Sequence, residues 1–226
     1  MKLLSQHDSM IDSAAMCPSD ANIKLIVRHS ERYPTKIFDV KNQDVSLTAE
    51  GRNIARQFGA SLGTPIGSLT SGWQARCVQT CEEIMNGSEG IREIIKTETL
   101  VGSHVIDTEK NSKLFTEIGA EGVITKYANG EEIEGLRTLS DSVEPILDLI
   151  FATGNKQSTV DIFCTHGFHM AQFLLYIFGC DPENRDEILG HWPGMMEGLF
   201  LWGTRDCFYA VWRGDKRAVL TIQNTL

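Results

Sequence analysis

Two arginines flank one histidine in the segment Arg28-His29-Ser30-Glu31-Arg32, which directly follows a short apolar run. Clustered cations at the end of a buried strand are costly unless an anion neutralises them. The planar guanidinium group binds phosphate oxygens through two parallel hydrogen bonds, and nearby positive charge lowers the pKa of an imidazole and keeps it nucleophilic. The segment indicates an anion site, although these residues alone also fit a structural ion-pair cluster.

Two later segments carry residues suited to the same chemistry. Residues 71–76 (Ser-Gly-Trp-Gln-Ala-Arg) combine a strand end, a glycine turn and a helix start, and a helix N-terminus offers free N–H groups to an anion. Residues 165–167 (Thr-His-Gly) place a histidine after another apolar run, next to a glycine that permits close approach of a ligand. Taken singly, Arg76 could be a surface arginine and His166 a satisfied core histidine.

The elements around these segments predict how they are positioned. Short runs rich in β-branched and other apolar residues predict buried strands over 23–27, 66–71 and 159–164. Apolar residues at helical spacing predict helices over 48–62, 74–85, 139–151 and 168–178. This alternation is typical of an α/β fold with a mostly parallel sheet. Open sheets of this kind bind ligands at the carboxyl ends of their strands, where the charged segments fall.

The rest of the chain is expected to complete a single domain over residues 22–226, because this length suits one α/β unit. Residues 1–21 are polar and predict a flexible N-terminal arm. Residues 91–137 are mostly polar, with glycine turns, and are expected to form an insertion or cap-like region over the site. Residues 199–202 and 209–212 predict a closing pair of strands.

Composition narrows the class of protein. Hydrophobic residues make up 42% and charged residues 23%, which is the profile of a globular protein. The net charge of −9 and the lack of a Lys/Arg run argue against nucleic acid or a membrane surface as partner. The chain shows neither a signal-peptide core nor a run long enough to span a membrane, so we expect a cytoplasmic location. The six cysteines lack the spacing of a zinc site.

Taken together, the segments resemble the ordered motifs of the histidine phosphatase superfamily, the phosphoglycerate-mutase-like fold. Residues 28–34 resemble its Arg-His-Gly motif with an Arg-x-Pro extension, and residues 47–51 its Leu-Thr-x-x-Gly. Residues 71–80 resemble Ser-x-x-x-Arg-x-x-Gln-Thr, and residues 165–167 the late Ser/Thr-His-Gly/Asp. The resemblance implies a three-layer αβα sandwich with a mostly parallel central sheet.

The resemblance also implies a mechanism. His29 would attack phosphorus and form a phosphohistidine, while the phosphoryl oxygens would be bound by Arg28, Arg32, Arg76 and His166. Water would then hydrolyse the intermediate. The expected protein is a phosphomonoester hydrolase that needs no metal and no cofactor, because arginines supply the positive charge. A small phosphorylated molecule is the expected partner, and the chain would be a monomer or a homodimer.

Two departures from the family pattern affect the site. A proton donor is needed for the leaving oxygen, and some members use an Asp directly after the late histidine, where this chain has Gly167. The first candidate is Asp107, in a loop that resembles a Gly-x-x-Val-Val-Asp segment of some bacterial members, and the alternatives are His104, Glu98 and His169. Ser30 stands where glycine is usual, which would add bulk and a hydroxyl beside the phosphate.

Two other functions stay open at this point. A phosphotransferase or mutase would use the same chemistry with a different acceptor, but sugar-phosphate mutases of the family usually carry a longer insertion than residues 91–137. A module that binds phosphorylated partners without turning them over is the third possibility, and Gly167 keeps it open because the acid is missing there.

Overall fold

The computed structural model describes residues 7–34, 45–89, 93–154 and 156–220. Within these ranges one sheet of seven strands has the order β3-β2-β4-β1-β5-β6-β7. The parallel part consists of β1 (Asn22–Arg28), β2 (Ile66–Gly72), β3 (Ile95–Thr97) and β4 (Thr159–Thr165). An antiparallel extension consists of β5 (Gly198–Thr204), β6 (Cys207–Trp212) and β7 (Asp215–Leu220).

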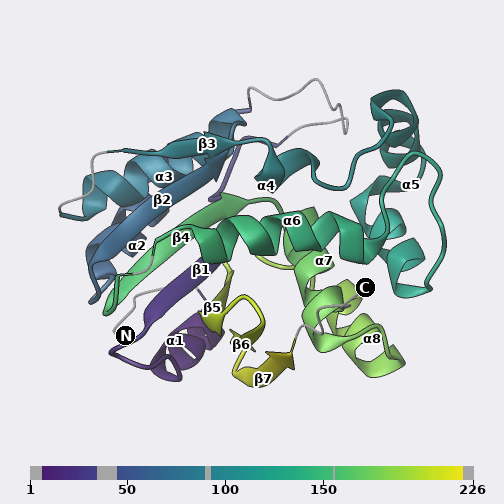
Figure 1. Ribbon diagram of the computed structural model, residues 1–226. Coiled ribbons are helices and arrows are strands. Elements are labelled where there is room, and N and C mark those ends of the chain that lie inside the picture. Colours follow the sequence, from purple (N-terminus) through teal and green to yellow (C-terminus); the bar gives the residue numbers. More distant parts are fainter. Residues whose placement is uncertain (1–6, 35–44, 90–92, 155, 221–226) are drawn as a thin grey trace.

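Helices cover both faces of this sheet (Figure 1). One face carries α1 (Asp8–Ala15), α2 (Ala49–Ser61) and α3 (Ala75–Gly87). The other carries α6 (Leu139–Ala152) and α7 (Gly167–Phe178), with α5 (Thr108–Ala128) and α8 (Pro182–Gly190) packed beside α7. A short helix, α4 (Thr99–Gly102), follows β3.

Alternate residues of the central strands divide the core into two clusters. On β1, Ile26 packs with α6 and α7, whereas Leu25 and Val27 pack with the helices of the opposite face. A strand buried on both faces must be apolar at successive positions, which explains the continuous run in β1. The predicted three-layer αβα sandwich is therefore confirmed, with the antiparallel extension as its C-terminal part.

Strand register brings several strand ends to one edge of the sheet. In the parallel pair of β1 and β4, Arg28 stands opposite Thr165. On the other side of β4, Ser71 of β2 stands opposite Cys164. The strand β4 lies between β1 and β2, so the chain leaves β1 and crosses over β4 to start β2. Such a change of direction in strand order opens a crevice at the carboxyl edge, where α/β proteins bind ligands.

The N-terminal segment differs from the prediction of a flexible arm. Residues 8–15 form α1, in which Met10 is 2% exposed and Ala14 is fully buried against β5 and β6. His7 contacts the carbonyl oxygen of Met195 at 2.8 Å. The prediction is wrong for residues 7–15, because Met10 and Ala14, one helical turn apart, form the buried face of a short helix in an otherwise polar stretch. Residues 1–6 lie outside the described ranges.

The segment 91–137 contains one long helix. Thr108–Ala128 is a helix with one break at Gly119, whose φ of 69° lies in the left-handed region that glycine tolerates. Its buried side chains pack with α7 in the core. Although this helix has 21 residues, neither it nor another helix in the described ranges combines the length and apolarity needed to cross a bilayer.

Candidate active site

Two histidines meet at the carboxyl edge of the parallel strands. His29 directly follows β1 and His166 directly follows β4, and their ring centroids lie 5.4 Å apart. The backbone N–H of His29 donates to the carbonyl of Thr165 at 2.9 Å, so the register of the two strands fixes this approach. His29 is 3% exposed. The structure thus brings together two residues that the sequence separates widely.

Three arginines lie near these rings, and their positive charges lower one another's pKa and the pKa of the rings. The pKa of Arg28 is lowered to about 10 by burial and by the neighbouring charges of Arg32 and Arg76. The pKa of His29 is held well below its usual value by burial first, and then by Arg28 and Arg76. The pKa of His166 is also held well below its usual value, first by burial and then by Arg76 and His29. Both imidazoles are therefore neutral at neutral pH.

Within the ranges that the structure describes, Arg28 and Arg76 have no carboxylate at ion-pair distance. Among the described residues, neither Arg28 nor Arg76 forms an ion pair with a carboxylate. The Nε atoms of both are buried without a hydrogen-bond partner in the described structure. The charge of Glu197 acts on Arg28 without forming an ion pair with it. Buried guanidinium groups that repel one another and lack a direct carboxylate contact indicate an anion as the missing partner. The geometry favours a tetrahedral oxyanion between these groups and His29.

A backbone contact decides which nitrogen of His29 is free. Its Nδ1 lies 2.8 Å from the carbonyl oxygen of Ser30. A carbonyl can only accept, so Nδ1 carries the proton and donates it. In the neutral imidazole the lone pair is then on Nε2. His29 therefore has the tautomer needed for nucleophilic attack by Nε2.

Ser30 has a structural role, which corrects the prediction of a hydroxyl beside the phosphate. The residue is fully buried, and its Oγ donates to the carbonyl of Gly51 in α2 at 2.7 Å. Its backbone N–H donates to Oγ1 of Thr80 in α3 at 2.9 Å. The side chain is directed into the contact with α2, because a hydroxyl buried there is satisfied by a helix carbonyl.

The start of α2 supports the same loop. Thr48 caps this helix, because its Oγ1 accepts the backbone N–H of Gly51 at 2.9 Å. A Cβ on Gly51 would lie 2.0 Å from the carbonyl oxygen of Glu31, so only glycine allows this approach. The side-chain Oε1 of Gln79 accepts the N–H of Leu47 at 2.8 Å. The sequence motif contained these residues, but their scaffold roles emerge only from the contacts.

A family model described as "Histidine phosphatase superfamily (branch 1)" matches residues 25–191, which is more than half of the chain. The chain belongs to the histidine phosphatase superfamily. The matched residues include the loop after β1, the start of α3 and the late histidine. The family resemblance inferred from the sequence motifs is confirmed.

Solved structures share the fold of this histidine phosphatase. The mycobacterial glucosyl-3-phosphoglycerate phosphatase has a TM-score of 0.57 at 13% identity, over 88% of this chain and 98% of that one. YhfR of Bacillus stearothermophilus has a TM-score of 0.56 at 16% identity, and the match covers 86% of this chain and 98% of that one. The phosphoserine phosphatase of Entamoeba histolytica has a TM-score of 0.52 at 16% identity, and the match covers 88% of this chain and 95% of that one. No curated protein matches by sequence.

The packing around Gly167 explains why no acid follows the late histidine in this member of the superfamily. A Cβ at this position would lie 2.5 Å from Nε1 of Trp192, and 3.2 Å from Nε of Arg28. An aspartate would therefore require the indole of Trp192 to move and Arg28 to shift slightly. The space that some family members give to an acid is occupied here by an indole and a guanidinium group.

The two candidate carboxylates differ in their surroundings. Asp107 caps α5, where its Oδ1 accepts the backbone N–H groups of Glu109 and Lys110 at 3.0 and 3.1 Å. Glu98 is exposed and directly follows β3, whose last residue, Thr97, pairs with Gly72 at the end of β2. Glu98 is thus placed at the same sheet edge as the histidine pair, whereas Asp107 is engaged in a structural cap.

The two candidate histidines lie behind the site. The rings of His104 and His169 are 5.2 Å apart, and His169 is 6.1 Å from His166. Burial lowers the pKa of His104 to about 4 and that of His169 well below its usual value. A buried imidazole that is neutral at neutral pH is a poor source of a proton for a leaving group. Neither ring is favoured as the acid.

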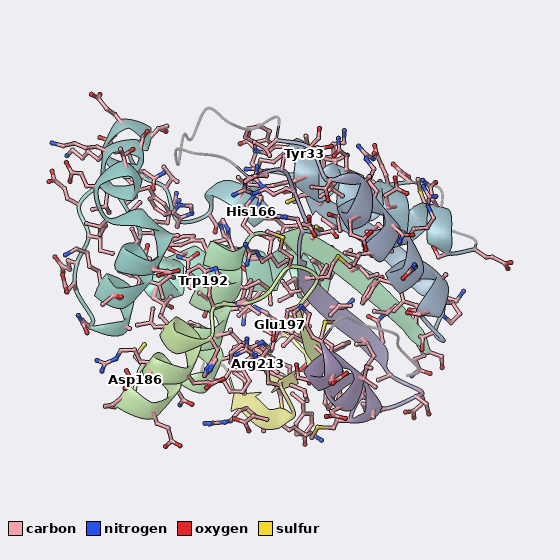
Figure 2. All side chains as sticks on the ribbon, turned by 180° about the vertical axis from the view of Figure 1, so that it is seen from behind. Tyr33, His166, Asp186, Trp192, Glu197 and Arg213 are labelled. Carbon is pink, nitrogen blue, oxygen red and sulfur yellow. The ribbon has the colours of Figure 1, made fainter. Side chains whose placement is uncertain are left out.

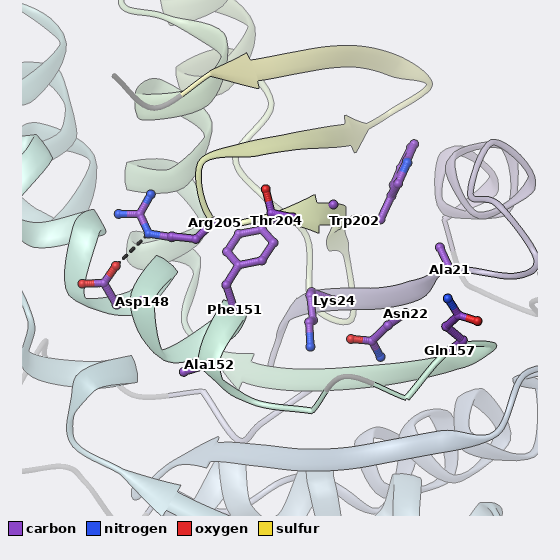
Figure 3. A pocket seen from close by; sticks show the side chains of 11 residues that line it. Ala21, Asn22, Lys24, Asp148, Phe151, Ala152, Gln157, Trp202, Thr204 and Arg205 are labelled. Atoms are coloured by element: carbon purple, nitrogen blue, oxygen red, sulfur yellow. Dashed lines mark hydrogen bonds and ion pairs between the residues drawn. The ribbon is translucent and has the colours of Figure 1, made fainter. Parts of the chain in front are cut away.

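A separate pocket of about 680 Å³ opens near the amino end of β1, away from the histidines (Figure 3). Its charges are paired internally. Lys24 donates to Asp161 at 2.8 Å and to the carbonyl of Gly154 at 2.7 Å, and Arg205 donates to Asp148 at 2.7 Å. Cations that already have partners offer little to an added anion, in contrast to those at the carboxyl edge.

Proposed function

We propose that the protein is a phosphomonoester hydrolase that works through a phosphohistidine on His29. The observation that carries the proposal is the placement of a neutral His29, with its lone pair on Nε2, among Arg28 and Arg76, which lack carboxylate partners in the described structure. Membership of the histidine phosphatase superfamily supports it. A small phosphorylated molecule is the proposed substrate.

The proposed reaction has two displacement steps. In the first, Nε2 of His29 attacks phosphorus, the N–P bond forms and the bond to the leaving oxygen breaks. In the second, water attacks the phosphoryl group and gives a proton to the general acid that was deprotonated in the first step, while the N–P bond breaks and inorganic phosphate leaves. The arginines and His166 surround the position where negative charge develops, and preorganised donors of this kind lower the barrier of both steps.

We propose Glu98 as the acid that protonates the leaving oxygen, ahead of Asp107. The carboxylate of Asp107 is committed to the first turn of α5. Glu98 stands at the carboxyl edge of the sheet and is exposed to solvent. A general acid must come within hydrogen-bond reach of the leaving group, and the edge position satisfies this requirement more directly.

Hydrolysis is favoured over transfer to a second substrate. Two of the structures that share the fold, from mycobacteria and Entamoeba histolytica, are named phosphatases. An assay with excess glycerol separates the two outcomes, because a transferase would place part of the phosphoryl group on the alcohol. A hydrolase releases inorganic phosphate at the rate at which substrate disappears.

The test is turnover of p-nitrophenyl phosphate in the presence of EDTA. The wild-type protein should release phosphate, and His29→Ala should reduce the rate by at least about 1000-fold, because the nucleophile is removed. Lys113→Ala is the control, since Lys113 is an exposed residue on α5, and it should keep wild-type activity. Equal turnover by wild type and His29→Ala would overturn the proposal.

A further inference from the structure

A loop after α8 contacts Arg28 of the proposed phosphate site, and residues 192–197 of this loop lie beyond the residues that the family model matches. The loop comprises residues 191–197 and makes three hydrogen bonds with Arg28. The backbone N–H of Arg28 donates to the carbonyl of Glu197 at 3.0 Å, and the N–H of Met196 donates to the carbonyl of Arg28 at 3.1 Å. The side-chain Nη1 of Arg28 donates to the carbonyl of Pro193 at 2.5 Å. The loop and the inner arginine therefore form one unit.

Trp192 brings a hydrogen-bond donor to this unit. Its Nε1 lies 2.5 Å from the position of a Cβ on Gly167, the residue after His166, and Nε of Arg28 lies 3.2 Å from the same point. In Figure 2 the labelled Trp192 lies between His166 above and the pair of Glu197 and Arg213 below. The indole packs against the core while the residue stays partly exposed. Its Nε1 and the Nε of Arg28 therefore both lie close to the residue that follows His166.

Contacts of the Glu197 side chain hold the loop in a fixed conformation. The carboxylate of Glu197 is 2% exposed. It accepts the backbone N–H of Gly194 at 2.7 Å and Nε of Arg213 at 2.7 Å. Met196 has a φ of 61°, which a residue with a side chain adopts only where surrounding contacts hold it. A donor on such a loop is already oriented before a ligand binds, which reduces the entropic cost of binding.

We propose that Trp192 is a substrate-binding residue whose indole N–H donates to a phosphoryl oxygen that Arg28 also holds. The indole is a donor only, and a phosphoryl oxygen has several lone pairs to share between two donors. The buried Nε of Arg28 has no hydrogen-bond partner in the described structure, so the anion that satisfies it comes within reach of Trp192. The inference rests on the proposed function, because it places the phosphoryl group beside Arg28.

The test uses inorganic phosphate and isothermal titration calorimetry on the full chain. Trp192→Phe keeps an aromatic ring and removes the N–H group. Because a hydrogen bond to a charged group is lost, the dissociation constant for phosphate should rise on the order of 10-fold. Trp202→Phe is the matched control, since Trp202 lies on β5 and stacks on Tyr209 at 5.5 Å between ring centroids. It should bind phosphate as tightly as the wild type.

A second measurement on the wild type does not depend on the stability of a variant. Phosphate should shift the indole N–H resonance of Trp192, assigned by its loss in Trp192→Phe, more than those of the other three tryptophans. If phosphate binds the wild type but leaves this resonance and the affinity of Trp192→Phe unchanged, the assignment of Trp192 is wrong and the proposed function stands. If phosphate does not bind the wild type at all, the anion site itself is wrong and both proposals are overturned.

Discussion

Oγ1 of Thr80 accepts the backbone N–H of Ser30 at 2.9 Å, which ties the loop behind the nucleophile to α3. The same hydroxyl donates to the carbonyl of Arg76 at 2.7 Å. One buried side chain therefore links the residue after His29 to a phosphate-binding arginine. The relative position of nucleophile and arginine depends on this link, because both ends are backbone atoms.

Thr80→Val should lower both stability and activity. Valine has the shape of threonine but leaves the N–H of Ser30 buried without an acceptor, which costs about 1–3 kcal/mol. A shift of the nucleophile by a fraction of an ångström should reduce kcat roughly 10-fold. Urea unfolding and steady-state kinetics measure the two effects. Thr80→Ser keeps the hydroxyl and should restore most of the activity, and a Thr80→Ser variant as impaired as Thr80→Val would contradict this role.

Glu98→Gln should slow the enzyme in a way that depends on the leaving group. A general acid typically contributes at least about 100-fold where the leaving oxygen is basic, so an alkyl phosphate should lose about that factor in kcat. p-Nitrophenyl phosphate has a good leaving group and should lose less than about 10-fold. Comparable losses on both substrates would show that Glu98 does not donate the proton.

Asp107→Ala is expected to affect stability instead of catalysis. Loss of the cap of α5 costs about 1 kcal/mol in the free energy of unfolding, and kcat on the alkyl phosphate should stay within about twofold of the wild type. Urea unfolding and the same kinetic assay apply. A large loss of kcat on the alkyl phosphate alone would return Asp107 to the role of proton donor.

Acidic pH should destabilise the protein through its buried histidines. The pKa of His104 is lowered to about 4 in the folded state, against about 6.5 in an unfolded chain. Between these values the unfolded chain binds more protons, so the free energy of unfolding falls as pH decreases. His104 alone should account for about 2 kcal/mol between pH 6.5 and 5.

His104→Gln should therefore flatten the dependence of stability on pH by about that amount, measured by urea unfolding at pH 7 and 5. The comparison uses slopes, since the substitution also alters packing against Phe115 and Phe168. Phe115→Leu alters packing around the same ring but removes no titrating group, and it should keep the wild-type slope. If His104→Gln shows the same slope as the wild type, the folded protein does not lower the pKa of His104.

Arg213 has two carboxylate partners that allow a matched pair of variants. Glu197 is buried and holds the loop that contacts Arg28, whereas Glu187 is about half exposed. Glu197→Gln should cost about 2 kcal/mol of stability, because hydrogen bonds to a charged group are weakened, and it should raise KM for p-nitrophenyl phosphate. Glu187→Gln should cost less than about 1 kcal/mol and leave KM unchanged. Equal KM values in the two variants would show that Glu197 does not contribute to phosphate binding.

Much of the fold and the site could be predicted from sequence because local patterns carried the information. Leu25, Ile26 and Val27 are apolar at successive positions, as a strand buried on both faces requires. The charged residues that follow such strands must emerge at the carboxyl edge, so the approach of His29 to His166 follows from topology. Thr48 and Gly63 likewise marked the limits of α2 to within a few residues.

Other features depend on contacts between distant segments. Helix α1 contains Ser, Asp and Met, and only the surface of β5 and β6 decides that Met10 is buried. The direction of the Ser30 hydroxyl depends on where α2 packs, and the exclusion of an acid at Gly167 depends on Trp192. The strand β7 lacked a strong periodic pattern. Helix α8 also lacked one, although its start carries local signals, the cap by Asp181 and Pro182 in the first turn.

The central claim is the covalent intermediate on His29. The wild-type protein would be mixed with a ³²P-labelled phosphomonoester, quenched within milliseconds in alkali, and analysed for label on the chain. The account predicts a label that survives alkali, is lost in acid, maps to the peptide containing His29 and is absent from His29→Ala. Label on another residue, or full turnover with no label at any quench time, would contradict it.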